Sequence, residues 1–593
     1  MSTETTTQPF RHPIINCHTH IFTGDHVPPY LAKTFLPWPF YYLLPISLVV
    51  KLFRFWYNTV YTWQFKPWYN QLKEIFYKVK MFAARYGLLR FFSFLIGIFL
   101  VIQVFFILFS WLSYFSSPST SVNNSFENLR SWMWSHGLIF IPASVRGKLL
   151  LVLLLMLFYK SGRNLVWVAL KKIWSFLGIL SGPDTKDLAR RYLNIGRFAF
   201  YKQQTRVFGR LKNQYPAGTG FVILPMDMEY MSAGTLKKES IYSKQMQALA
   251  ALKSRLDKEH VIYPFIFADP RRIIAEGPLQ FDYRVDNGTV ILHDCFIKKY
   301  IEEMEFSGFK IYPALGYYPF DEALLPLWKY AADNGFPITT HCIRGTIYYR
   351  GRKKKEWDIH PVFNQAKGND KYEPLKMLEV ENKDFANNFT HPLNYLCLLE
   401  ESLLRKLVAN AKDDKIRELF GFTNLQTPLL QNLGHLKICF GHFGGDDEWN
   451  RFIELDRDNF GNQLVRHPEK GITFLTDEEG NHKPGKPEQL WKYADWYSII
   501  CSLMLQYSNV YADVSYILHK PEVQPLLKQT LLNPKLRTKV LFGTDFYVVR
   551  NHKSEKNMLA DMLFYLKEPE FDQIARINPI GFLSNNRKTV TAI

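Results

Sequence analysis

The chain has 593 residues, too many for one ordinary hydrophobic core, so more than one structural unit is expected. Its 73 Lys and Arg residues outnumber its 54 Asp and Glu residues, for a formal net charge of +19. Such a charge favours nucleic acid or an anionic membrane surface as a partner. The sequence has no nucleic-acid-binding motif, so we expect no nucleic-acid partner. Its long apolar tracts favour the membrane.

The cysteines and the first residues indicate a reducing compartment. The chain has 6 cysteines, widely spaced and without a C-x-x-C pair, which predicts buried thiols instead of a disulfide framework. The opening sequence MSTETTTQPFRHP is polar and has no apolar core, so no cleavable signal peptide is expected. A cytoplasmic catalytic part follows.

Residues 13–22 (PIINCHTHIF) form a short apolar run that contains two histidines, His18 and His20. On a β-strand, side chains two residues apart point to one face. Two neutral imidazoles on one face can bind one metal ion, but an isolated His-x-His is as often a polar pair on a half-buried strand.

From about residue 37 the composition becomes strongly apolar. Residues 91–113 are free of charge and long enough to cross a hydrocarbon core of about 30 Å. A second candidate span covers 149–170, with weaker ones at 40–58 and 164–180. Basic residues precede the strong span and are few in 114–145, so the positive-inside rule places the preceding segment in the cytoplasm.

From about residue 184, short β-rich runs alternate with helix-patterned segments, which predicts parallel βαβ units. With the first strand these runs give eight strands, the number in a (β/α)8 TIM barrel. Both ends of the membrane tract must then emerge on one side, so two or four crossings are allowed, and interfacial helices could replace the weaker spans. The seven further runs are 220–228, 261–268, 308–313, 336–341, 436–442, 509–515 and 539–545.

We therefore predict an α/β fold, a discontinuous TIM barrel with an α-helical transmembrane insertion after strand one. Residues 1–30 hold the first strand, 31–183 the membrane insertion and 184–593 the rest of the barrel. In such barrels the catalytic groups lie at the C-terminal strand ends. One histidine there is usually structural, whereas an ordered set is harder to explain that way. The strands end in His18 and His20 (first), His341 (fifth), His442 (sixth) and Asp545 (eighth).

The segments NCHTH, SGFKIYPALGYYP, FPITTHC, CFGHFGG, NVYADVS, VLFGTDF and NPIGFL together resemble the amidohydrolase superfamily. The resemblance is to its amidohydrolase-2 branch of metal-dependent hydrolases and related decarboxylases. It implies that His18, His20, His341 and Asp545 bind one divalent ion, zinc first, with manganese, iron or a second metal as alternatives. It also makes Asp545 the general base. His442 would polarise the substrate or hold an anionic intermediate, or bind a second metal.

Four further residues are candidates for the same site. Three roles are open for Lys310. It could be carbamylated and bridge two metals, it could be a charged group beside the ligands or the substrate, or the strand register could point it away from the site. Asn16 stands where relatives often have Asp, and strand alternation predicts it on the face of His18. Tyr312 and Arg344 are candidate substrate contacts, since arginine can clamp a carboxylate, although an exposed structural arginine is an equal alternative.

The expected function is a membrane-anchored hydrolase that uses a metal-activated water on an ester, amide or related bond. The alternatives are non-oxidative decarboxylation of an aromatic or unsaturated acid, and a non-enzymatic membrane scaffold with a vestigial metal site. We expect an integral protein of the bacterial cytoplasmic membrane with its catalytic domain in the cytoplasm. Because the tract begins in the loop after strand one, at the barrel rim, the mouth is predicted to lie near the bilayer and admit a small amphiphilic substrate.

Overall fold

The computed structural model describes residues 12–31, 67–112, 121–139 and 201–587, with gaps at 237–241, 256–261, 346, 369–370 and 455–458, and a few isolated positions elsewhere. The chain packs as two units, one of Met1–Arg54 with Asp187–Ile593 and the other of Phe55–Lys186. The predicted insertion ran from 31 to 183.

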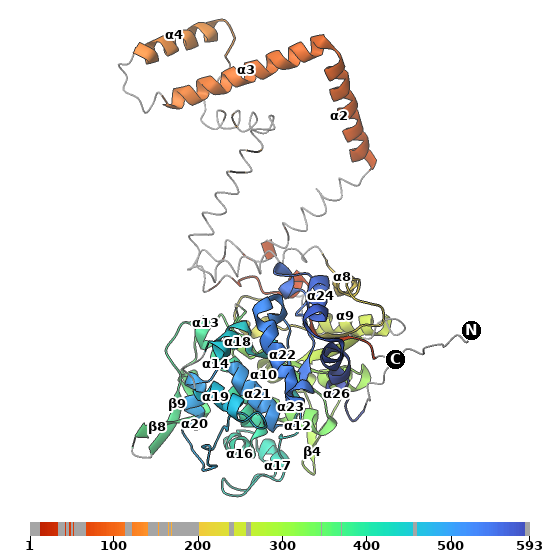
Figure 1. Cartoon of the computed structure of the whole chain (residues 1–593), viewed down its shortest axis with the longest axis vertical. Coiled ribbons are helices and arrows are strands. Elements are labelled where there is room, and N and C mark those ends of the chain that lie inside the picture. The colour runs from red at the N-terminus through yellow and green to blue at the C-terminus, as the bar shows by residue number, and fades with distance from the viewer. Residues whose placement is uncertain are drawn as a thin grey trace, which may run out of the picture. The chain divides into compact units, whose positions relative to one another are not determined.

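The first unit is built on one sheet of eight parallel strands. Its main helices, from α8 to α26, are labelled in Figure 1. The last strand returns to the first, since the Cys17 N–H donates to the Phe542 carbonyl at 2.8 Å and the Asp545 N–H to the His18 carbonyl at 2.9 Å. The predicted TIM barrel is confirmed. In sheet order the strands are β1 (Ile15–Thr19), β2 (Gly220–Ile223), β3 (Ile262–Phe267), β6 (Gly308–Ile311), β7 (Ile338–His341), β10 (Ile438–Gly441), β11 (Val510–Asp513) and β12 (Val540–Leu541).

Helices follow the strands, and local sequence signals determine where several of them begin and end. Asp495 caps the N-terminus of α21 by accepting the Ser498 N–H at 2.6 Å. Gly335 ends α12 in the left-handed conformation. The main helices are α8 (Gln204–Lys212), α9 (Tyr242–Arg255), α10 (Pro270–Glu276), α12 (Leu325–Asn334), α16 (Glu401–Ala409), α17 (Asp414–Phe420), α18 (Asp446–Ile453), α19 (Asn459–Arg466), α20 (Lys486–Tyr493), α21 (Trp496–Gln506), α22 (Gln524–Leu532), α24 (Glu555–Tyr565) and α26 (Asn578–Leu583).

Apolar side chains fill the barrel from its floor upward. A buried cluster inside the sheet includes Ile15, Val222 and Phe265, whereas their strand neighbours Phe221 and Ile223 pack outward against the helices. This alternation is the period-two pattern of a strand. Phe582 and Leu583 of α26 join the inner cluster and close the floor. The His and Asp residues that end the strands lie at the opposite end of the barrel.

Two antiparallel hairpins lie outside the barrel and were not predicted. β4 (Tyr283–Asp286) and β5 (Thr289–Leu292) are joined by Asn287-Gly288, both at positive φ, a pair that favours tight hairpins. The second hairpin consists of β8 (Ile359–Gly368) and β9 (Lys371–Lys376).

The second unit contains α2 (Pro67–Arg85), α3 (Gly87–Leu112) and α4 (Ser121–Ser135). Among the described residues, α3 is the one helix long and apolar enough to cross a membrane by length and composition. It coincides with the strongest predicted span. The other candidate spans, 40–58, 149–170 and 164–180, fall outside the described residues apart from isolated positions, so the number of crossings stays a prediction.

Candidate metal centre

The His-x-His segment lies on an irregular stretch of β1. The pairing of β1 with β2 shifts register between Asn16 and Thr19. Cys17 packs inside the barrel, yet the neighbouring His18 also points inward, with Nδ1 2.9 Å from Asp513 Oδ2. The shift allows two consecutive side chains to enter the barrel.

Asn16 lies on the opposite side of the strand from His18. Its Nδ2 donates to Tyr215 Oη at 2.9 Å and to Thr544 Oγ1 at 2.8 Å, in the layer between sheet and helices. The prediction that it shares a face with His18 is wrong, because the register shift breaks the alternation. Asn16 still supports the centre, since its Oδ1 accepts the His18 N–H at 3.2 Å.

Asp545 brings the end of the eighth strand to both histidines of β1. Its Oδ1 lies 3.2 Å from His20 Nε2 and 3.9 Å from His18 Nε2. The residue has φ 59°, a conformation rare outside glycine that turns the chain at the strand end. Burial raises the Asp545 pKa, but the nearby imidazoles, His20 foremost, hold it below its usual value overall. The carboxylate is therefore ionised at neutral pH.

His442 completes a compact group of three donors. Donor atoms of His18, His442 and Asp545 all lie within 4.8 Å of one another, and all three residues are buried. His442 Nε2 is 3.1 Å from His341 Nδ1, so the fifth-strand histidine reaches the group through His442. The sequence placed His341 among the ligands and His442 beside them. The structure sets His442 in the closest group.

Neighbouring acceptors fix the protonation of the rings. The Leu224 carbonyl lies 2.8 Å from His20 Nδ1 and can only accept, so Nδ1 carries the proton and Nε2 keeps its lone pair toward Asp545. The Asp513 carboxylate likewise accepts from His18 Nδ1, so the proton of His18 is on Nδ1. His18 Nε2 is buried without a hydrogen-bond partner among the described residues. Lone pairs aimed at a shared point are what a metal ion requires.

The distances also fit a divalent ion. With bonds of about 2.0–2.1 Å, ligand atoms around a tetrahedral zinc stand roughly 3.3 Å apart. The separations of Asp545 Oδ1 from His20 Nε2 and His18 Nε2, 3.2 and 3.9 Å, bracket that value. Burial lowers the pKa of His18 and takes that of His442 to about 3, so both rings are neutral as ligands must be. The buried set can hold a metal ion, whose identity the donors leave open.

Lys310 lies inside the barrel near this group. The residue is 1% exposed, and its Nζ has no hydrogen-bond partner among the described residues. Burial lowers the Lys310 pKa to about 8, against the opposing influence of Asp513 and Asp545. Its strand neighbours Phe309 and Ile311 pack in the outer cluster, so Lys310 points into the barrel, and the register that would point it away from the site is wrong.

Asp513 is the functional residue that the sequence reasoning missed. Its carboxylate accepts from His18 Nδ1, from the Ser515 hydroxyl, and from the N–H groups of His442 at 3.2 Å and Ser515 at 3.1 Å. Because Ser515 gives its proton to Asp513, its Oγ must accept from His442 Nδ1, 2.9 Å away. His442 Nε2 is thereby left with its lone pair. The signal was available: Asp513 ends the seventh barrel strand.

The two candidate substrate contacts are engaged by the protein itself. The Tyr312 ring stacks on His341 with centroids 3.8 Å apart and planes inclined by 12°. Arg344 Nη2 lies 3.1 Å from Glu448 Oε1, and half of the arginine side chain is exposed. Tyr312 orients a histidine of the centre. The part of either residue in substrate binding stays a prediction.

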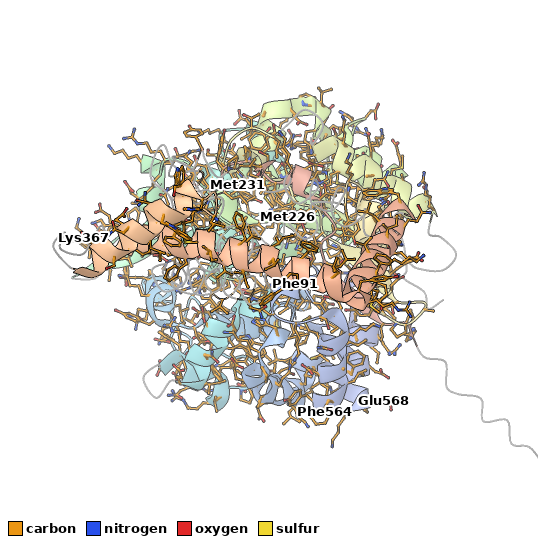
Figure 2. The ribbon with its side chains drawn as sticks, turned by 90° about the horizontal axis from the view of Figure 1, so that it is seen from above. Phe91, Met226, Met231, Lys367, Phe564 and Glu568 are labelled. Carbon is orange, nitrogen blue, oxygen red and sulfur yellow. The ribbon has the colours of Figure 1, made fainter. Side chains whose placement is uncertain are left out.

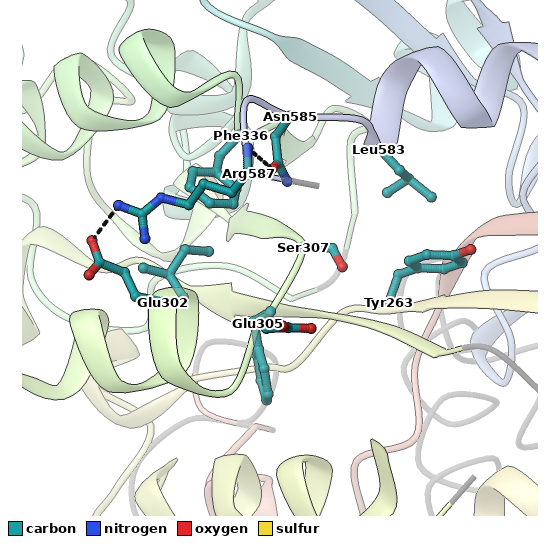
Figure 3. Close-up of a pocket in the computed structure, with 10 residues that line it drawn as sticks. Tyr263, Glu302, Glu305, Ser307, Phe336, Leu583, Asn585 and Arg587 are labelled. Atoms are coloured by element: carbon teal, nitrogen blue, oxygen red, sulfur yellow. Dashed lines mark hydrogen bonds and ion pairs between the residues drawn. The ribbon is translucent and has the colours of Figure 1, made fainter. Parts of the chain in front are cut away.

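A cavity of about 200 Å³ lies at the other end of the barrel (Figure 3). Tyr263, near the start of β3, and Ser307 and Phe336, which precede β6 and β7, line it together with Leu583 of α26. An ion pair of 2.9 Å between Glu302 and Arg587 borders it. It contains none of the His and Asp donors, so it belongs to the floor and not to the metal centre.

Comparisons with known proteins find only distant structural similarity. No family model matches the chain, and no curated protein matches its sequence. Similar solved structures include the TIM-barrel protein Bb4693 of Bordetella bronchiseptica, with 10% identity, TM-score 0.32, and coverage of 67% of this chain and 90% of that one. Amidohydrolase map2389c of Mycobacterium avium subsp. paratuberculosis K-10 is 14% identical, with a TM-score of 0.27 and coverage of 65% of this chain and 75% of that one. 4-Oxalomesaconate hydratase LigJ of Rhodopseudomonas palustris is 11% identical, with a TM-score of 0.30 and coverage of 63% of this chain and 79% of that one. At these scores the similarity carries no inference about function, which rests on the geometry above.

Proposed function

We propose that the chain is a metal-dependent hydrolase that uses a divalent ion, zinc first, held by His18, His20, His442 and Asp545, with His341 beside them. The observation that carries this proposal is the convergence of buried donors whose lone pairs are fixed by partners outside the group. Structural histidines normally have both ring nitrogens satisfied. His18 Nε2 is buried without a partner among the described residues.

The reaction would divide between the ion and the side chains. A bound divalent ion supplies Lewis acidity and lowers the pKa of water to near neutrality. Asp545, ionised and at the strand end, accepts the proton of the attacking water and returns it to the leaving group. His442, neutral and with Nε2 unprotonated, accepts a hydrogen bond from the substrate or binds the ion directly. Lys310 stabilises negative charge that develops on the substrate.

Non-oxidative decarboxylation is the second candidate, and Lys310 favours it. A buried ammonium that lacks a hydrogen-bond partner among the described residues is well suited to receive a carboxylate from the substrate. The same donors serve both reactions, so product analysis separates them. Release of carbon dioxide supports decarboxylation, and release of an acid with an alcohol or amine supports hydrolysis.

The proposal includes anchorage in a membrane with the catalytic domain in the cytoplasm. The support is α3, whose residues 87–108 have a mean hydropathy of 2.8 in the most apolar window. α3 itself exposes phenylalanine and aliphatic side chains, including Phe91 (labelled in Figure 2), Phe94 and Val101. An amphiphilic substrate drawn from the bilayer is part of the same proposal.

Metal content of the purified full chain tests the assignment. We expect about one equivalent of zinc by elemental analysis in the wild type, and a loss of at least about tenfold in affinity in Asp545→Asn and His18→Gln. His293→Gln is the matched control, because His293 is exposed and pairs only with the exposed Asp282 in the described contacts. Undiminished stoichiometric metal in both centre variants would overturn the assignment. A metal-loaded protein inert on ester, amide and carboxylic-acid panels would favour a scaffold.

A further inference from the structure

Helix α2 carries a continuous apolar stripe. Leu72, Ile75, Val79 and Phe82 follow one another at intervals of three and four residues, and Trp68 stands four residues before Leu72. At 3.6 residues per turn these positions fall on one line along the helix. The opposite side of α2 is largely polar, with positions such as Asn70, Glu74 and Tyr77, and Met81 is an apolar exception.

The stripe is exposed instead of packed. Leu72 is 44% exposed, Ile75 and Val79 are each 58% and Phe82 is 57%. A globular protein normally buries such a stripe in its core. The stripe of α2 is therefore an apolar surface available to a partner outside the core. Beside the stripe Lys78 pairs with Glu74 at 2.9 Å, and both side chains are largely exposed.

The position and charge of α2 indicate what covers the stripe. α2 ends at Arg85 and α3 begins at Gly87, so only Tyr86 separates the amphipathic helix from the apolar one. Within their own unit the two helices meet at a pronounced bend (Figure 1). α2 carries four basic residues, Lys73, Lys78, Lys80 and Arg85, against the single acid Glu74. Anionic headgroups attract such charges near the membrane surface.

We propose that α2 lies in the plane of the membrane interface, with its stripe in the acyl boundary and its basic face toward anionic headgroups. This rests on the proposed membrane anchorage through α3. A transverse orientation is excluded by the charges distributed along α2. A lipid surface fits better than a second copy of the chain, since α3 brings the stripe to the bilayer and the basic excess would repel an identical helix.

Accessibility of spin labels tests the orientation. Single cysteines replace Ile75 or Val79 on the stripe, Tyr77 or Met81 on the opposite side, and Ile96 in α3, in the full chain reconstituted in phosphatidylglycerol–phosphatidylcholine nanodiscs. The six native cysteines are all buried, so labelling favours the introduced sites. We expect oxygen accessibility at 75 and 79 to exceed that at 77 and 81 several-fold. A water-soluble nickel reagent should show the reverse order.

Each other pattern contradicts the proposal in a recognisable way. Equal accessibility on both sides would show that α2 is not interfacial, and protection of 75 and 79 from both reagents would indicate a protein partner, including a second copy. If the label at Ile96→Cys is accessible to oxygen, the membrane anchorage through α3 stands whichever of these two patterns α2 shows. If that label is accessible to nickel, both the anchorage and the interfacial position of α2 are overturned. In pure phosphatidylcholine the immersion of 75 and 79 should decrease. An unchanged value would overturn the part assigned to anionic lipid.

Discussion

Asp513 and His18 form a fully buried pair in which the carboxylate Oδ2 lies 2.9 Å from the imidazole Nδ1. They stand on β11 and β1, which are separated in the sheet by β12. Through Ser515 the same carboxylate also sets the proton of His442. One acid therefore orients two imidazoles from different strands, and its removal should disturb the metal centre without removing a ligand.

Replacing Asp513 by Asn should weaken metal binding by about 10- to 100-fold while His18, His442 and Asp545 remain. The amide has one acceptor oxygen where the carboxylate has two, so several buried N–H and O–H donors lose their partner. Metal titration of the purified variant measures the effect. Asp269→Asn is the control, because Asp269 is equally buried but caps α10 and pairs with Arg271. Equal metal affinity in the two variants would contradict the role of Asp513.

Lys310 should lower the stability of the fold that holds it. A folded-state pKa of about 8, below the ordinary 10.5, means that its charge opposes folding at pH 7 and that this penalty fades as the pH rises from 8 toward 10.5. Lys310→Met keeps the shape and removes the charge, so we expect the free energy of unfolding to rise by about 1–3 kcal/mol, with catalysis reduced.

The control for Lys310 is the same substitution at Lys329. Lys329 is also buried, but its Nζ lies 2.5 Å from Asp333 Oδ1, so Lys329→Met breaks a pair and should destabilise the protein. Thermal unfolding of both variants measures the change in stability, which we expect to be an increase for Lys310→Met and a decrease for Lys329→Met. A lower melting temperature for Lys310→Met than for the wild type would show that Lys310 has a partner that stabilises it.

The sequence was sufficient for the barrel because strand-end chemistry and period-two apolar runs are local signals. His18, His20, His341, His442 and Asp545 were found as strand ends, and the structure gathers them at one end of the sheet. Alternation alone placed Asn16 on the wrong face, because a register shift is set by pairing with β2 and not by the strand's own residues. Asp513 also ends a barrel strand, but that position does not show that it orients two imidazoles, which follows only from its contacts with residues distant in sequence.

A buried histidine outside the centre should make the protein sensitive to acid. His360 Nδ1 accepts the N–H groups of Val362 and Phe363 at 3.1 and 2.9 Å, and Nε2 lies 3.1 Å from Asn394 Oδ1. Burial lowers the His360 pKa to about 3. A lowered pKa means that stability is complete above the unfolded value of 6.5 and falls as the pH drops toward 3.

From these values His360 should account for a loss of about 2 kcal/mol between pH 7 and pH 5. His360→Gln keeps an acceptor oxygen and cannot titrate, so its melting temperature should fall less than that of the wild type over this range. His435→Gln is the control, since His435 is half exposed. Parallel pH profiles for wild type and His360→Gln would show that His360 does not carry this sensitivity.

Gly543 should be required for the position of His18. A Cβ at residue 543 would lie 2.8 Å from His18 Cβ, closer than such atoms approach, and 3.2 Å from Ser515 Cβ, a tight contact. Neither neighbour can rotate away, because both contacts are at the base of a side chain. Gly543→Ala should therefore displace His18, weaken metal binding at least about tenfold and reduce stability by about 1–3 kcal/mol. Gly209→Ala is the matched control, because a Cβ there meets nothing within 4 Å and alanine favours the helix α8. Metal titration of the two alanine variants should separate them. Retention of wild-type affinity in Gly543→Ala would show that β1 can move without loss of the centre.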